Sequence, residues 1–470
     1  MTVGARPARD AGIGAVAGVA GGVVFGVAMG LVGTLPSVAQ IVRSDSPAVG
    51  FVLHMAIASF LGAGFGVLVS HQRVRVGETL LWGLLYGVFW WFLGAQTLLP
   101  ILAGRALAWD LAGAGRVFPS LIGHLFYGGV TAVVFVALRR GAVAPPRPRL
   151  GTLARGAAAG VIAAGVLYLV ADVMAGAELN RLAVIGVLVG AGYPALFGTG
   201  SERSGPALIR GAVYGFLIWV LDLTLLPVLD GGSPSWSRDA AAASVPDLPP
   251  SVLLGAGVAV VFGWLGGLSR LLFADDVRAV HREAPGGWGL RALGHGALAG
   301  LAGGVLFTAV LAAVGALPRV AQIMGSAATG TGLVLNLLIA LVIGVSYAVL
   351  FRRCSFDVIS GIGWGACYGF FWWMLGPLTL LPALTGATPR FDPATIAVNF
   401  PALVGHLAYG AALGGTYYLL EARANPWWLT RNQAESERVL ALRDQTLGSA
   451  PALWGLTVLI ALTVPLLVTS

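Results

Sequence analysis

Five polar side chains that could do chemistry lie inside stretches apolar enough to cross a membrane. Burying a polar group in lipid is costly, and such residues often mark a substrate or ion pathway. The five are His54, His124, Asp172, Asp222 and His406. Each lies close to one end of its stretch, which places all five at a common depth of roughly 6–10 Å below the outer membrane face, at 1.5 Å per helical residue.

Two kinds of chemistry suit these residue types. Asp172 and Asp222, facing a wet cavity, could bind a cation or carry protons. Histidines on separate helices could hold a b-type haem, since imidazole is a common axial ligand, and His54 with His124 offers such a pair. Structural roles stand beside both. The histidines could hydrogen-bond neighbouring helices, Asp172 could simply reach the interface, and Asp222 could form an ion pair with Arg181.

The stretches that position these residues are predicted to be transmembrane helices. A helix of about 20 mostly apolar residues crosses a bilayer. By that measure the sequence predicts an all-α polytopic membrane bundle of about 13 transmembrane helices. The predicted ranges are 11–34, 48–70, 79–101, 118–138, 155–175, 182–198, 208–228, 251–273, 294–316, 330–350, 360–382, 400–420 and 452–468.

Four sequence motifs occur twice, 282 residues apart, with no gap between the two copies. The motifs are LPxVAQI at Leu35 and Leu317, YGxxWWxLG at Tyr86 and Tyr368, LLP at Leu98 and Leu380, and GHLxYG at Gly123 and Gly405. Such self-similarity indicates repeated structural units.

A degenerate third copy lies between these two. It keeps Tyr214-Gly215, Trp219 and the LLP sequence of 225–227, but it lacks equivalents of His54 and His124. It carries Asp222 where the other copies have Gly94 and Gly376. Drift in an unused copy predicts apolar replacements, so the gain of a carboxylate favours a role for this residue.

The chain therefore divides into three four-helix membrane units, 1–140, 150–275 (degenerate) and 292–421, followed by a polar cytoplasmic segment and a last helix in 422–470. An even number of helices gives every unit the same orientation, so an axis along the membrane normal should relate them. The motif set resembles small uncharacterised bacterial integral membrane proteins made of one four-helix copy. That resemblance covers most of 11–138 and 294–420; it implies the fold and no activity.

The LPxVAQI segments have two readings. As re-entrant turns they would point Gln40 and Gln322 into a cavity, whereas as proline-stopped helix ends they would not. Glycines repeated every four residues in 14–30 and 296–304 predict close helix packing, because small residues let helix backbones approach. The mid-span tryptophans Trp90 and Trp91 are either core packing or a flat ligand-stacking surface.

Composition limits the class of protein. Hydrophobic residues make up 57% of the chain and charged residues only 10%, against about 25% charged in soluble domains. A soluble enzyme, a disordered chain and a disulfide-rich domain are excluded. All 28 basic residues are arginine, and three quarters of them fall on the side of the N-terminus. The positive-inside rule then places the N-terminus in the cytoplasm and the C-terminus outside, in a bacterial plasma membrane.

Three functions remain open. The first is a permease or channel-like protein for an ion or small molecule, with its polar site in the outer half of the bundle. The second is a structural or assembly subunit that binds a membrane-protein partner through helix 452–468. The third is a redox subunit holding haem b. The sequence contains no motif for metal or nucleotide binding and none for enzyme catalysis. We therefore expect contact with the lipid bilayer, no nucleic acid, and no chemistry on a soluble substrate.

Overall fold

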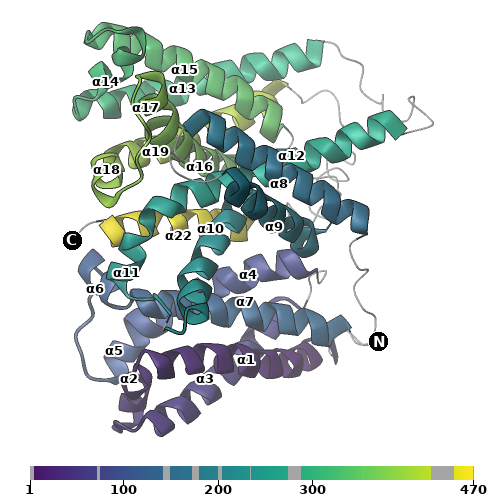
Figure 1. Cartoon of the computed structure of the whole chain (residues 1–470), viewed down its shortest axis with the longest axis vertical. Helices are drawn as coiled ribbons and strands as arrows, with labels where there is room; N and C mark the ends of the chain where they lie inside the picture. Colours follow the sequence, from purple (N-terminus) through teal and green to yellow (C-terminus); the bar gives the residue numbers. More distant parts are fainter. Residues whose placement is uncertain are drawn as a thin grey trace.

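The computed structural model describes residues 5–70, 75–140, 149–171, 179–198, 204–232, 234–273, 287–352, 354–424 and 449–468, and every regular element in these ranges is helical (Figure 1). Eleven helices in the described ranges are long and apolar enough to cross a membrane. A helix satisfies all its backbone hydrogen bonds internally, which a lipid environment requires. The chain is therefore an all-helical, multi-pass membrane protein.

The helices fall into three groups and a last helix. The first unit contains α1 (Ala5–Leu31), α2 (Leu35–Ala39), η1 (Gln40–Val42), α3 (Pro47–Leu68), α4 (Val76–Trp90), η2 (Trp91–Leu98), α5 (Leu99–Leu102), α6 (Leu111–Arg116) and α7 (Phe118–Arg140). The middle unit contains α8 (Leu150–Ala171), α9 (Leu179–Phe197), α10 (Ser204–Leu229), α11 (Arg238–Ala243), η3 (Val245–Asp247) and α12 (Leu248–Phe273). The third unit contains α13 (Gly287–Ala313), α14 (Leu317–Ala321), η5 (Gln322–Met324), α15 (Thr329–Phe351), α16 (Val358–Leu375), η6 (Gly376–Leu380), α17 (Leu381–Leu384), α18 (Pro393–Val398) and α19 (Phe400–Ala424). The last helix is α22 (Ala450–Val468).

A helix lies at each of the thirteen predicted ranges, but two of these helices are not among the eleven candidate spans. The apolar part of α9 is only Val184–Phe197. Although α19 is 25 residues long, it carries His406, three tyrosines and several glycines, which lower its hydropathy. Length and composition alone therefore support eleven crossings.

The same tryptophan hydrogen bond occurs in all three units. In each, the indole Nε1 of the third long helix donates to a backbone carbonyl just before the fourth long helix, at 2.8–3.0 Å. The pairs are Trp91 with Val117, Trp219 with Ser244, and Trp373 with Asn399. These three tryptophans are buried and serve as structural anchors, whereas Trp90 is only partly buried.

A tyrosine contact recurs in the first and third units. Tyr127 donates to the Ala58 carbonyl at 2.8 Å, and Tyr409 donates to the Ala340 carbonyl at 3.0 Å. Both bonds tie the fourth long helix of the unit to the second, and both join residues 69 apart. The two units therefore use the same side chains for the same helix contacts.

The repeated glycines bring helix backbones into direct contact. A Cβ on Gly14 would meet the Gly62 carbonyl and the Gly66 backbone, and one on Gly18 would meet the Ala58 carbonyl. The matching α13–α15 contact is built in the same way, with Gly296 against the Gly344 carbonyl. The predicted packing role of these glycines is confirmed.

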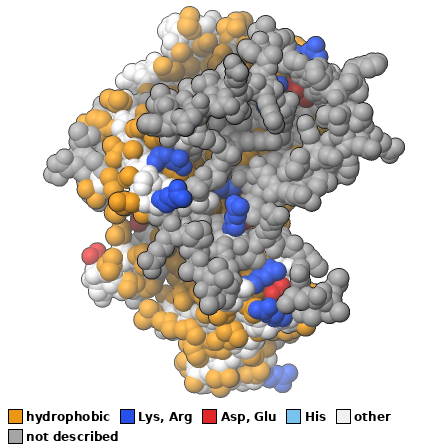
Figure 2. Space-filling view, turned by 90° about the vertical axis from the view of Figure 1, so that its right-hand side faces the viewer, with side chains coloured by type: hydrophobic (Ala, Val, Ile, Leu, Met, Phe, Trp, Pro, Cys, Tyr) orange, Lys and Arg blue, Asp and Glu red, His pale blue; other side chains and the backbone are white. Residues whose placement is uncertain are grey.

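The short helices α2, α6, α11, α14 and α18 gather at one end of the long helices, named here the short-helix end (Figure 1). Three of them begin at equivalent caps, in which a side-chain oxygen accepts a backbone N–H. The caps are Asp110 for α6, Ser237 for α11 and Asp392 for α18. The opposite end carries arginine side chains (Figure 2) and is named here the arginine end.

The last helix, α22, lies between the units. It packs against α4 of the first unit, α10 and α11 of the middle unit, and α16 and α18 of the third unit. Its apolar window is 67% buried, the largest share among the eleven candidate spans. Only Val458 and Leu462 remain as exposed large apolar side chains on it. Helices of all three units therefore pack around most of α22, and the exposed Val458 and Leu462 are the apolar surface it leaves for a membrane-protein partner.

Candidate functional site

Two cavities of similar size lie inside the first and middle units, in the half nearer the short-helix end. The histidine cavity, about 510 Å³, is lined by His54, His124 and mostly apolar side chains of the first unit. The aspartate cavity, about 490 Å³, is lined by Asp222, Asp247, Ser235, Ser244 and Ser251 together with apolar residues of the middle unit. Both volumes lie in the range of about 300–1,000 Å³ typical of small-molecule sites.

Helix α10 positions Asp222 in the aspartate cavity. The residue lies three positions after the anchor Trp219 and seven before the end of the helix at Leu229, so its backbone is about 10 Å below the short-helix end. Its side chain is exposed within the cavity. A carboxylate at this depth can therefore be reached from outside the bundle.

The segment after α10 folds back onto that helix and contributes Ser235 to the lining of the aspartate cavity. The Trp236 indole donates to the Thr224 hydroxyl at 2.9 Å, and the Ser235 amide donates to the Leu223 carbonyl at 2.9 Å. These bonds fold the segment back over the end of α10. The wall then presents hydroxyl and carboxylate oxygens, the ligands that hard cations prefer.

The residue at the Asp222 position faces the cavity in the first unit as well. Gly94 lies three residues after the anchor Trp91, and it lines the histidine cavity. A Cβ on Gly94 would meet no atom within 4 Å. The corresponding Gly376 of the third unit would meet only the His406 imidazole, at 3.9 Å. The middle unit therefore adds a carboxylate at a position that is an open wall in the first unit.

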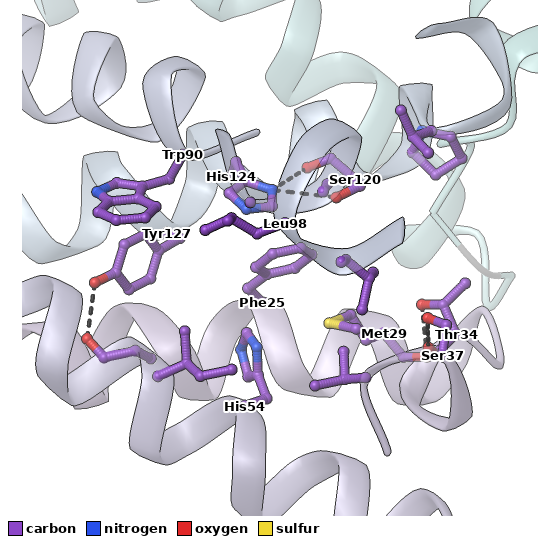
Figure 3. A pocket seen from close by; sticks show the side chains of 18 of the residues that line it. Phe25, Met29, Thr34, Ser37, His54, Trp90, Leu98, Ser120, His124 and Tyr127 are labelled. Atoms are coloured by element: carbon purple, nitrogen blue, oxygen red, sulfur yellow. Dashed lines mark hydrogen bonds between the residues drawn. The ribbon is translucent and has the colours of Figure 1, made fainter. Parts of the chain in front are cut away.

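The two histidines of the first unit flank the ring of Phe25 (Figure 3). The ring centroid of Phe25 is 5.2 Å from that of His54 and 5.0 Å from that of His124, and both contacts are edge-on. The His54 Nε2–H donates to the Gly22 carbonyl at 3.1 Å, and the His124 Nδ1–H donates to the Ser120 carbonyl at 2.7 Å. The His54 bond joins α3 to α1, which is the structural role considered for the histidines, whereas the His124 bond lies within α7.

This arrangement does not suit a haem. A haem held by His54 and His124 would have to lie between the two imidazoles, where the Phe25 ring lies. The His54 Nε2 atom is also engaged by the Gly22 carbonyl.

His406 of the third unit is buried. Its Nδ1–H donates to the Ala402 carbonyl at 2.7 Å, and its ring lies 4.4 Å from the Phe307 ring. Asn336, which replaces His54 in this unit, donates to the Thr308 hydroxyl at 2.8 Å. The third unit thus keeps the helix contacts of the first.

The structure does not bring all the candidate residues together. His54 and His124 line one cavity, Asp222 lines another, and His406 is buried in the third unit. Gln40 and Gln322 are exposed in η1 and η5, and neither lines the histidine or the aspartate cavity. Two further candidates lie outside what can be placed: Asp172 is not among the described residues, and neither is the Arg181 side chain.

The sequence pattern does not single out two charged groups that the structure places in a cavity or in the protein interior. One is Asp247, which η3 places in the aspartate cavity. The other is Arg210, whose side chain is only 1% exposed and lies 3.7 Å from Glu78. Arg210 lies two residues inside the predicted transmembrane range 208–228, and a charge at that position is the sequence feature that indicates its burial.

Within the described residues, no three His, Cys, Asp or Glu side chains form a group that could hold a metal ion. Comparisons with protein-family models, curated proteins and solved structures find no match to this chain.

Proposed function

We propose that this chain is a permease or channel-like protein of a bacterial plasma membrane, with a cation- or proton-binding site in its middle unit. The proposal includes thirteen crossings, built from three parallel four-helix units and α22. The tryptophan anchor shared by all three units and the tyrosine bond shared by the first and third support the repeat. The short-helix end would face the outside, in agreement with the arginine side chains at the opposite end (Figure 2).

The observation that carries the proposal is Asp222 in an open cavity within the span. A carboxylate in a lipid-embedded segment is costly and is usually retained for a function. Asp247 and three serine residues line the same cavity, so a cation entering it would meet several oxygen ligands. Among the described residues that line the histidine cavity, none is negatively charged. This asymmetry supports the proposal that the selective group lies in the middle unit.

The packing of α22 also limits where a path for cations or protons can cross the membrane. A pore on an axis between three units would have to pass where α22 packs against all three of them. The apolar residues of α22 fill that space. A path through the middle unit, past Asp222, avoids this obstacle.

Replacing Asp222 by asparagine is expected to abolish or strongly lower cation-dependent proton movement, because the amide cannot ionise. The measurement uses the full chain in liposomes loaded with a pH-sensitive dye, under an imposed Na⁺ or K⁺ gradient. Asp239→Asn, which removes an exposed carboxylate of α11 outside the cavity, is the matched control. Wild-type liposomes without flux, or Asp222→Asn liposomes with wild-type flux, would overturn the proposal.

Topology gives an independent prediction. Reporter fusions after Arg140, Arg282 and Arg443 should read as cytoplasmic, and a fusion after Ser470 should read as external, since thirteen crossings separate the ends. Alkaline phosphatase and fluorescent-protein fusions report the two sides. A cytoplasmic reading at Ser470 would mean an even number of crossings.

A further inference from the structure

The histidine cavity has the depth of one membrane leaflet. Thr34 and Ser37 line it at the short-helix end, and Phe60 and Leu61 line it deeper in the membrane. Phe60 is thirteen residues from the first residue of α3, Pro47, which is about 20 Å along the helix. One leaflet contributes about 15 Å to the hydrocarbon core. The cavity therefore reaches from the membrane surface to about the bilayer middle.

The cavity opens sideways toward lipid. Its walls are α3 on one side and η2 with α5 on the other, and α3 packs mainly on α1 and α2 whereas η2 packs on α4, α5 and α7. Three apolar lining residues are exposed on the outside of the bundle: Phe60 at 75%, Leu98 at 40% and Leu102 at 57%. In a membrane, side chains exposed at this depth meet hydrocarbon chains, so an occupant can enter from the leaflet.

The wall is apolar below the rim and basic at the rim. His54 and His124 each direct an N–H to a backbone carbonyl, and Phe25, Met29 and Trp90 supply much of the remaining surface (Figure 3). Arg116, the last residue of α6, is the charged lining residue, and its side chain is exposed.

This arginine distinguishes the first unit from the others. Arg116 directly precedes the residue whose carbonyl accepts the tryptophan anchor, and the corresponding residues in the other units are Ala243 and Val398. The middle unit instead lines its cavity with carboxylates. The two cavities are thus adapted to opposite charges.

We propose that the histidine cavity binds a hydrocarbon chain of an anionic phospholipid drawn from the leaflet at the short-helix end, with the phosphate of the head group at Arg116. The apolar wall accommodates the chain, the lateral opening admits it, and the guanidinium pairs with the phosphate.

The test uses the full chain in phosphatidylcholine nanodiscs that contain a photoactivatable phosphatidylglycerol with a diazirine in its acyl chain. A diacylglycerol with the same tagged chain is the neutral probe. Mass spectrometry of the crosslinked peptides should place the anionic probe on α3 and on η2–α5. Inorganic phosphate, added as a competitor, should not displace it.

Two variants test the binding of the lipid's hydrocarbon chain and of its head group separately. Gly94→Leu should abolish labelling of α3 and η2, because the new side chain enters open space in the cavity. Arg116→Gln should lower labelling by the anionic probe about fivefold, the weight of one exposed ion pair, and leave the neutral probe unchanged. Arg105→Gln, at an exposed arginine of the same end that does not line the cavity, is the matched control.

Wild-type labelling in Gly94→Leu, equal losses for both probes in Arg116→Gln, or displacement by free phosphate would each overturn this inference. The Arg116→Gln result stands even if Gly94→Leu fails to fold, because Arg116 is exposed. The Asp222→Asn variant should label normally, so the two proposals can fail separately.

Discussion

Replacing Arg210 by methionine is expected to lower the free energy of unfolding by about 3–5 kcal/mol, because it leaves Glu78 as a buried charge without its partner. The Arg210 guanidinium lies 3.7 Å from a Glu78 carboxylate oxygen, and the arginine side chain is 1% exposed. It also lies over the Phe197 ring, 5.1 Å from the centroid. These contacts join α4 of the first unit to α9 and α10 of the middle unit.

The measurement is denaturation of the purified protein in detergent micelles, followed by circular dichroism. A double variant, Glu78→Met with Arg210→Met, should recover most of the loss, since a buried ion pair can be replaced by apolar residues at little cost. Arg105→Gln, which removes an exposed arginine, should stay within about 0.5 kcal/mol of the wild type. If Arg210→Met unfolds like the wild type, the pair does not hold the two units together.

Gly128→Ala is expected to destabilise the protein by about 1–3 kcal/mol or more, because the added methyl group has no space. A Cβ on Gly128 would meet the Gly83 carbonyl and come within 3.1 Å of the Gly87 amide nitrogen, so the backbones of α4 and α7 would have to separate. Gly410→Ala should have a similar effect in the third unit, where the Gly365 carbonyl takes the place of Gly83.

The control for these variants is Gly12→Ala. A Cβ on Gly12 would meet no atom within 4 Å, and alanine is favoured over glycine within a helix by about 1 kcal/mol. The same detergent unfolding series should therefore show opposite signs for Gly12→Ala and Gly128→Ala. Equal effects would mean that helix propensity, and not backbone contact, governs both positions.

Several features were determined by the sequence alone. The helix ranges could be predicted because a long apolar stretch in lipid has to form a helix, whatever its neighbours are. The carboxylate at Asp222 could also be recognised as unusual from the sequence. Trp91, Trp219 and Trp373 align the three copies, and the alignment shows that Asp222 replaces a glycine of the other two copies.

Which residues share a cavity was decided only by the tertiary structure. Depth along a helix follows from residue number, but lipid and protein interior are both apolar, so hydrophobicity does not reveal which way a helix face points. Asp222 therefore shares its cavity with Asp247 and not with the histidines. The Phe25 ring lies between His54 and His124. The place of α22 among all three units was decided in the same way, because its apolar surface would suit lipid as well as protein and only the contacts of the folded chain distinguish the two.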